Sequence, residues 1–255
     1  ATIPELAEAL GSGRSRTLEL SFLPGWRSEE MANYLGVVGA AQIDAAAFQQ
    51  IVASRNGLNG NYGFLSSLPD GASLEGYLFP DRYTIGDDTT AAALIDLMLA
   101  RFDAQVTPAM RQAYGTLGLS LRDAVILASI IEKEAALAEE KPLMAAVFLN
   151  RLAAGMPLQA DPTVQYALGF VDGTWWKAPL SAADLQVNSP YNTYLIPGLP
   201  PGPISNPSLA SLLAVANPAD VDYLFFVVDC TAATLGAHAF SVTYDEHLAN
   251  VARCQ

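Results

Sequence analysis

The apolar run from Ala124 to Ile131, interrupted only by Ser129, constrains the fold of this chain more than any other segment. It follows Ser120-Leu-Arg-Asp123, where an acidic residue three positions after a serine is a variant of the helix capping box. It leads directly into Glu132-Lys133-Glu134. The pattern predicts a helix over about 120–138 that is buried for most of its length and ends in charged residues.

Composition limits the classes of protein that this chain can belong to. The 255 residues are 51% hydrophobic, enough for one large domain or two smaller ones. There are 13 basic and 26 acidic residues, and this balance argues against a nucleic-acid partner, because a polyanion requires a basic surface. It suits a neutral or weakly charged substrate. With two cysteines and two histidines we expect no zinc site and no cofactor.

Three features bear on the cellular setting. No apolar run approaches the roughly 20 residues that cross a bilayer, and no signal-peptide pattern follows Ala1. The chain is therefore expected to be a mature protein or a soluble fragment of a longer one. Cys230 and Cys254 leave two interpretations open, a disulfide formed in an oxidising setting or two unrelated thiols.

The pattern along the chain predicts an α+β protein in two parts. Residues 1–73 form a small module and linker, with a strand at 17–22, a helix at 28–35 capped by Ser28, a helix at 40–53 and a Gly/Asn/Ser-rich stretch at 54–73. Residues 74–255 form the larger part. Strand-like residues at 74–85 are followed by helices at 89–102, 107–114, 120–138, 142–155 and 161–168, the last capped by Asp161.

The end of the chain combines a loop with a hairpin. Six prolines between Pro190 and Pro207 exclude a regular helix or central strand and predict a stiff loop. A strand at 222–228, expected to be buried on both faces, is predicted to pair with 239–243, and a helix at 242–251 closes the chain.

Glu132 is the leading candidate for a catalytic residue. A carboxyl in apolar surroundings has a raised pKa, and a protonated carboxyl near neutral pH is what a general acid for glycosidic-bond cleavage requires. Successive helical residues turn by about 100°, so Glu132 and Glu134 point about 200° apart and cannot both bracket one scissile bond. If the helix is catalytic, one glutamate acts and the other is structural. The competing interpretation is that both glutamates simply lie at a solvent-exposed helix end and have no catalytic role.

Polar residues downstream could converge on this helix end. Asn150 and Arg151 lie on the next predicted helix, and Gln159, Asp161 and Thr163 follow. A helix end would equally explain Asn150 and Arg151, and a helix cap would explain Asp161.

Several long motifs, in order, resemble the MltG (YceG-like) family of endolytic murein transglycosylases. They are Leu74-Glu-Gly-Tyr-Leu-Phe-Pro80, Ala128-Ser-Ile-Ile-Glu-Lys-Glu134, Val147-Phe-Leu-Asn-Arg-Leu152, Leu158-Gln-Ala-Asp-Pro-Thr-Val-Gln-Tyr166, Ser189-Pro-Tyr-Asn-Thr-Tyr194 and Gly198-Leu-Pro-Pro-Gly-Pro-Ile-Ser-Asn-Pro207. The resemblance covers nearly the whole chain, and the segment around Leu23-Pro-Gly-Trp26 is similar to that family's LysM-like subdomain.

The resemblance implies a function and a site. Such enzymes cut glycan strands of peptidoglycan internally between MurNAc and GlcNAc and leave 1,6-anhydro-MurNAc ends. It implies a LysM-like glycan-binding subdomain over 1–73 and a catalytic domain over 74–255. It places the catalytic role on Glu132, with Glu134 as the reserve candidate. The implied substrate-binding residues are Asn150, Gln159, Asp161, Thr163, Tyr166, Ser189, Tyr191, Asn192 and Tyr194.

The resemblance also implies a setting. The family usually carries an N-terminal membrane helix, so we expect this chain to be a soluble fragment from the extracytoplasmic face of a bacterial membrane. Cell-wall synthesis proteins are candidate partners. Two other functions stay open: a peptidoglycan hydrolase that uses a second carboxylate such as Glu75 or Asp161, and a non-catalytic glycan-binding module.

Overall fold

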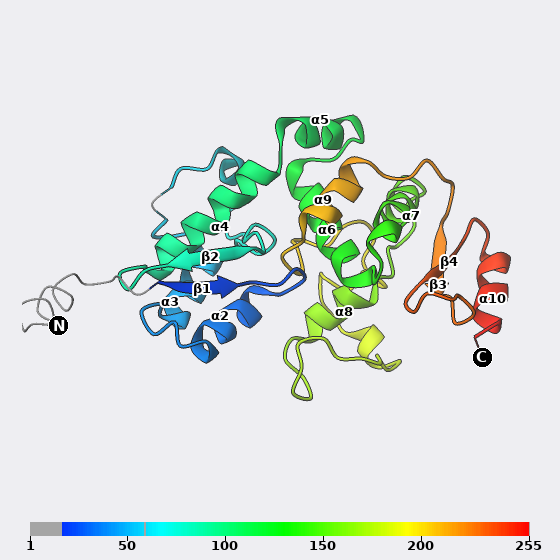
Figure 1. The fold of residues 1–255 in the computed structure, drawn as a ribbon. Helices are drawn as coiled ribbons and strands as arrows, with labels where there is room; N and C mark the ends of the chain where they lie inside the picture. Colours follow the sequence, from blue (N-terminus) through cyan, green and yellow to red (C-terminus); the bar gives the residue numbers. More distant parts are fainter. Residues whose placement is uncertain (1–16, 59, 255) are drawn as a thin grey trace, which may run out of the picture.

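A computed structural model describes residues 17–58 and 60–254, which form a mixed structure of nine α-helices and two small antiparallel sheets. Figure 1 shows β1, β2 and α2–α4 at one end, α5–α9 in the middle, and β3, β4 and α10 at the other end. The strands are β1 (Leu18–Ser21), β2 (Arg82–Ile85), β3 (Phe225–Val228) and β4 (His238–Ser241). The α-helices are α2 (Ser28–Val37), α3 (Ala45–Ser54), α4 (Ala91–Gln105), α5 (Pro108–Thr116), α6 (Leu121–Glu134), α7 (Lys141–Ala153), α8 (Asp161–Leu168), α9 (Leu209–Ala216) and α10 (Tyr244–Ala252). Short 3₁₀ helices cover Gly63–Ser67, Ala138–Glu140 and Asp184–Gln186.

Helix α6 is the buried centre of the molecule, as the apolar run predicts. Every residue from Ala124 to Ile131 is buried, and α6 packs against α5, α7, α8 and α9. The predicted capping box is confirmed, because the Ser120 hydroxyl accepts from the Asp123 N–H and the Asp123 carboxylate accepts from the Ser120 N–H. The helix ends at Glu134, earlier than predicted, where Ala135 turns to extended backbone.

The first sheet pairs segments that are distant in sequence. Strand β1 runs antiparallel to β2, with Leu18 opposite Ile85 and Leu20 opposite Tyr83. The pairing joins segments on both sides of the boundary expected at residue 73. Residues 1–16 of the predicted N-terminal module lie outside the described residues, and the division of the chain at 73 stays a prediction.

Two predicted helix caps are wrong by one residue. Arg27 is the N-cap of α2, and the Ser28 N–H and hydroxyl both donate to the buried Glu75 carboxyl, over 3.0 and 2.8 Å. Ala160 precedes α8, and Asp161 is the first helical residue. In each case the polar side chain has a tertiary partner, Glu75 for Ser28 and Tyr194 for Asp161, which local pattern cannot reveal.

The C-terminal hairpin corrects another expectation. Strands β3 and β4 pair antiparallel as predicted, but β3 is half-buried to exposed rather than buried on both faces, because its sheet has only two strands among the described residues. A disulfide between Cys230 and Cys254, with Cα atoms 5.6 Å apart, ties the β3–β4 turn to the residues after α10. Of the two interpretations of the cysteines, the structure has the disulfide.

Residues 190–207 form a loop without helix or strand, as their prolines predict. Asn206 in this loop joins separate segments. Its backbone bonds to Gly25 and Trp26, and its side-chain amide donates to Glu75 over 2.6 Å and accepts from the Gly76 N–H over 2.8 Å. The loop thereby holds the turn before α2 against the centre of the molecule.

Gly76 lies where this loop meets α6, and the position excludes a side chain. Its φ is +87°, and an added Cβ would lie 2.5 Å from Pro203 and 2.9 Å from Val125. We expect Gly76→Ala to lower the free energy of unfolding by about 2–3 kcal/mol, from left-handed strain and overpacking. Urea denaturation measures this. Gly115→Ala is the matched control, because its added Cβ would meet no described atom within 4 Å, and it should be neutral or slightly stabilising. Equal stability of the two variants would contradict the account.

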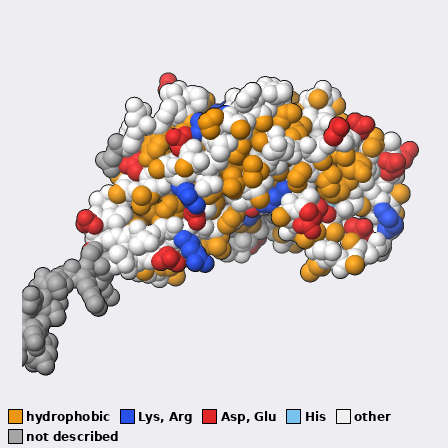
Figure 2. All heavy atoms as spheres, turned by 45° about the horizontal axis from the view of Figure 1, so that its top comes forward, with side chains coloured by type: hydrophobic (Ala, Val, Ile, Leu, Met, Phe, Trp, Pro, Cys, Tyr) orange, Lys and Arg blue, Asp and Glu red, His pale blue; other side chains and the backbone are white. Residues whose placement is uncertain are grey.

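The face of the molecule in Figure 2 mixes hydrophobic side chains with small groups of acidic and basic ones.

Within the described ranges, no single helix is long and apolar enough to cross a membrane. Helices α5 and α6 together have the required length and composition, but a bend of 92° separates them.

Candidate active site

The Glu132 carboxylate is fully engaged by neighbouring groups. Its oxygens accept from Lys141 Nζ at 3.0 Å, from the Ser208 N–H at 2.9 Å, and from the Ser208 and Ser211 hydroxyls at 2.5 and 2.6 Å. Burial raises the pKa of Glu132, but the hydrogen bonds from Ser208 and Ser211 and the charge of Lys141 outweigh it, so the pKa is lowered overall. The raised pKa predicted for Glu132 is therefore wrong.

Glu134 has the opposite environment. It lines a pocket of about 310 Å³ with Arg151, Gln159, Asp161 and Tyr194 as its polar neighbours. Within the described residues, no group donates a hydrogen bond to its carboxyl and no cation lies within ion-pairing distance. Burial first, and the negative charge of Asp161 second, raise the pKa of Glu134 to about 8, against the lowering effect of Arg151. A carboxyl with this pKa is mostly protonated at neutral pH.

The predicted divergence of the two glutamates is confirmed. Glu132 meets Lys141 at the start of α7 and serines around the start of α9, whereas Glu134 meets residues that lie before and at the start of α8. Two positions on one helix thus have two electrostatic environments, one that stabilises a carboxylate and one that stabilises a carboxylic acid.

Polar groups around the Glu134 pocket are fixed by contacts of their own. The Tyr194 hydroxyl donates to Asp161 over 2.6 Å. The Arg151 guanidinium donates to the carbonyls of Leu158 and Leu224 over 2.8 and 2.6 Å. Gln159 has a φ of +51°, and its N–H donates to the Thr193 carbonyl over 3.1 Å. The pocket therefore has preorganised walls.

Three predicted binding residues hold the framework instead of lining this pocket. Asn150 donates to the carbonyls of Val221 and Tyr223. Thr163 is buried and bonds to Thr193 over 2.8 Å. Asn192 is buried and donates to the carbonyls of Leu185 and Val187. These contacts hold the segments that carry Gln159, Asp161 and Tyr194.

The other predicted binding residues cluster at the far end of α8. The rings of Tyr166 and Tyr191 are 4.7 Å apart, and the Arg27 guanidinium lies 4.1 Å from the Tyr166 ring centroid. Ser189 accepts a hydrogen bond from the Tyr191 N–H. The sequence-predicted set thus divides between the Glu134 pocket, its framework and this aromatic cluster.

Three neighbours of Glu132, namely Lys141, Ser208 and Ser211, are not among the residues predicted from the sequence, whereas Arg151 is. Ser208 is the N-cap of α9, and a serine directly before an apolar helical run is a signal that could have indicated this helix. No local pattern indicates that both serines also reach Glu132.

Comparisons with known proteins place the chain in a family. A model of the YceG-like family matches residues 1–253, and the chain belongs to this family, which confirms the sequence resemblance. A crystal structure of a putative YceG-like protein from Listeria monocytogenes matches with a TM-score of 0.75 and 30% identity, over 97% of this chain and 80% of that one.

Two curated relatives carry the name endolytic murein transglycosylase. The protein from Streptococcus pneumoniae serotype 2 (strain D39 / NCTC 7466) is 39% identical over 196 residues, 74% of this chain and 34% of the relative. The protein from Bacillus subtilis (strain 168) is 39% identical over 176 residues, 68% of this chain and 46% of the relative. The matched part of the chain spans less than half the length of either relative.

Proposed function

We propose that this chain is an endolytic peptidoglycan lytic transglycosylase that cuts the MurNAc–GlcNAc β-1,4 bond within glycan strands and leaves 1,6-anhydro-MurNAc ends. We assign the general acid/base to Glu134 rather than Glu132. The observation that carries the assignment is the pocket around Glu134, where burial and Asp161 raise the pKa of a carboxyl that has no hydrogen-bond donor among the described residues. The names of the curated relatives support the reaction class.

The chemistry needs one carboxyl group. Protonated Glu134 donates its proton to the glycosidic oxygen as the C1–O bond breaks. The C6 hydroxyl of the same MurNAc then attacks C1, and the Glu134 carboxylate takes the hydroxyl proton, which returns the enzyme to its starting state. No second carboxylate nucleophile is required, unlike ordinary retaining hydrolysis. Tyr194 and Gln159 supply hydrogen-bonding groups at the pocket wall.

The pH profile tests the electrostatics of this pocket. Because Glu134 must begin protonated, the cleavage rate should fall as the pH rises through about 8. Asp161 raises the pKa of Glu134, so Asp161→Asn should move this alkaline limb to lower pH. Cleavage rates of wild type and variant, measured between pH 5 and about pH 10, give the pH at which the rate falls in each protein. An unmoved limb would show that Asp161 does not act on the titrating group.

Hydrolysis by a second carboxylate remains the alternative function, and one observation favours it. Asp161 lines the same pocket as Glu134, whereas Glu75 is buried against Ser28 and Asn206 and does not line that pocket. Mass spectrometry of digested peptidoglycan distinguishes the two reactions. Anhydro-MurNAc ends support the transglycosylase, and reducing MurNAc ends with incorporated ¹⁸O from labelled water would overturn it.

The proposal extends to the setting of the chain. We assign the N-terminal part to a LysM-like glycan-binding subdomain and 74–255 to the catalytic domain, on the strength of the motifs and the family. We place the chain on the extracytoplasmic face of a bacterial membrane. The Cys230–Cys254 disulfide supports this placement, because disulfides persist in oxidising compartments. Cell-wall synthesis proteins remain candidate partners.

A further inference from the structure

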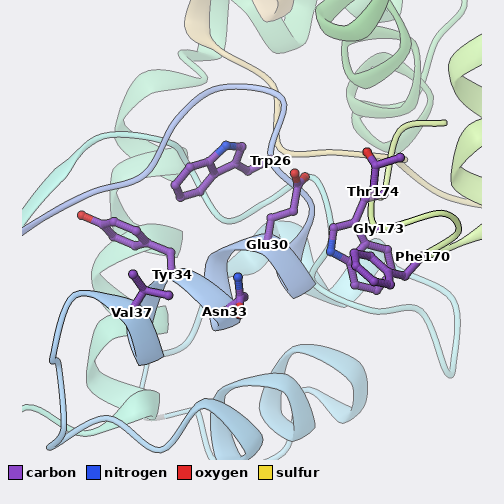
Figure 3. A pocket seen from close by; sticks show the side chains of 9 residues that line it. Trp26, Glu30, Asn33, Tyr34, Val37, Phe170, Gly173 and Thr174 are labelled. Carbon is purple, nitrogen blue, oxygen red and sulfur yellow. The ribbon is translucent and has the colours of Figure 1, made fainter. Parts of the chain in front are cut away.

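A second pocket, of about 510 Å³, lies between α2 and the loop that follows α8. Figure 3 shows Trp26 and Tyr34 on one side of Glu30, and Phe170 and Thr174 on the other. The first group comes from the N-terminal end of the molecule and the second from the loop after α8, so two separate segments form the walls.

The aromatic walls of this pocket are held in place before any ligand arrives. The rings of Trp26 and Tyr34 are 5.2 Å apart, and those of Phe170 and Trp175 are 5.1 Å apart. The buried Arg27 guanidinium lies 4.5 Å from the Trp175 ring centroid. Phe170 nevertheless keeps 60% of its surface exposed, so part of its ring is free to pack against a ligand.

The polar groups of the pocket suit a hydroxyl-rich ligand. Glu30 is already engaged by the Trp176 indole N–H and the Arg27 N–H, both at 3.0 Å. The Asn33 side chain is exposed and has no hydrogen-bond partner among the described residues, so its amide can both donate and accept. Flat rings beside such a group are the usual means of holding a sugar ring by its apolar face and its hydroxyls.

The position of the pocket relates it to the proposed active site. Asp161 begins α8 and lines the Glu134 pocket, whereas Phe170 lies just past the end of α8 and lines this one. The two pockets therefore lie at opposite ends of α8, whose length is roughly 12 Å at about 1.5 Å per residue. A single ligand that occupies both must be an extended polymer.

We propose that this aromatic pocket is a distal subsite for sugar rings of the same glycan strand whose scissile bond lies at Glu134. The proposal rests on the proposed function. It explains how an enzyme of this class would favour long strands over short fragments, because only a long strand fills both pockets.

Tryptophan fluorescence reports this pocket selectively. The chain has three tryptophans: Trp26 and Trp175 line the pocket, and Trp176 bonds to Glu30. Peptide-free glycan oligosaccharides of increasing length are titrated into Glu134→Gln protein, and mass spectrometry checks that each oligosaccharide stays intact during the titration. Long oligosaccharides should change the emission, and Phe170→Ala in that background should weaken their apparent Kd roughly 10-fold by loss of apolar contact. Asn33→Ala should independently weaken the affinity for long oligosaccharides. Leu235→Ala is the matched control, because the Leu235 side chain lies outside the pocket and is 97% exposed.

The outcomes separate this proposal from the proposed function. Binding is measured without turnover, so an inactive enzyme that still binds long strands through Phe170 and Asn33 supports the subsite even if the reaction is assigned wrongly. Unchanged emission, or wild-type affinity in both variants, overturns the subsite. An emission change produced by isolated stem peptide and not by peptide-free glycan also overturns it.

Discussion

Glu134→Gln should reduce the release of anhydro-MurNAc ends by about 10²–10⁴-fold, the usual contribution of a positioned general acid/base. Glutamine has nearly the same size and cannot donate a proton to the glycosidic oxygen. The rate is measured by mass spectrometry of products from purified glycan strands. Glu139→Gln is the matched control, because Glu139 is exposed and lies outside the Glu134 pocket. A Glu134→Gln variant with wild-type rate would contradict the proposal.

The same substitution should stabilise the fold at alkaline pH. The pKa of Glu134 is raised to about 8, so this carboxyl contributes fully to stability below the pKa of the unfolded chain and loses that contribution as the pH rises through the folded value. Glutamine never ionises. We therefore expect Glu134→Gln to raise the melting temperature by a few degrees at high pH and to match wild type in acid. A catalytic group that costs stability is typical of active sites.

Glu132→Ala should have a different consequence, a loss of about 3–5 kcal/mol in the free energy of unfolding. The Glu132 and Lys141 side chains are 10% and 9% exposed, so removal of the carboxylate leaves a buried ammonium without its counter-ion and two serine hydroxyls without their acceptor. Urea denaturation near neutral pH measures the loss. Glu139→Ala, at an exposed position, should change stability by less than about 0.5 kcal/mol.

A double-mutant cycle shows whether loss of the Glu132–Lys141 ion pair causes the drop in stability. Glu132→Ala with Lys141→Ala should cost less than the sum of the single losses, with a coupling of about 1–3 kcal/mol. The lowered pKa of Glu132 adds a pH signature, because its contribution is present above the ordinary carboxyl pKa and is lost as the pH falls through the folded value. The gap between wild type and Glu132→Ala should therefore close in acid. Additive single losses would show that Glu132 acts through other contacts.

Local pattern predicted most helices and the hairpin. The apolar run of α6, its capping box and the proline-rich loop depend on neighbours within a few residues, and the structure confirms all three. The burial of β3 depends on how many strands its sheet contains, and the caps of α2 and α8 depend on Glu75 and Tyr194. Such contacts between distant segments have no signature in a short window.

The same distinction applies to the two glutamates. Helical phase established that Glu132 and Glu134 diverge, but phase alone did not show which one meets cations and hydroxyls. Lys141 and Ser211 reach Glu132 from two other helices, and Asp161 raises the pKa of Glu134 from the start of a third. The pKa of each carboxyl is set by those tertiary neighbours, so the choice between them required the structure.

The most direct test of the central claim compares Glu132→Gln with Glu134→Gln, both checked for folding, on the same glycan strands. Mass spectrometry counts the anhydro-MurNAc ends that each releases. We expect Glu132→Gln to retain cleavage in proportion to its folded fraction and Glu134→Gln to release almost none. The reverse result, with cleavage retained by Glu134→Gln and abolished in folded Glu132→Gln, would contradict the assignment of Glu134 as the acid/base.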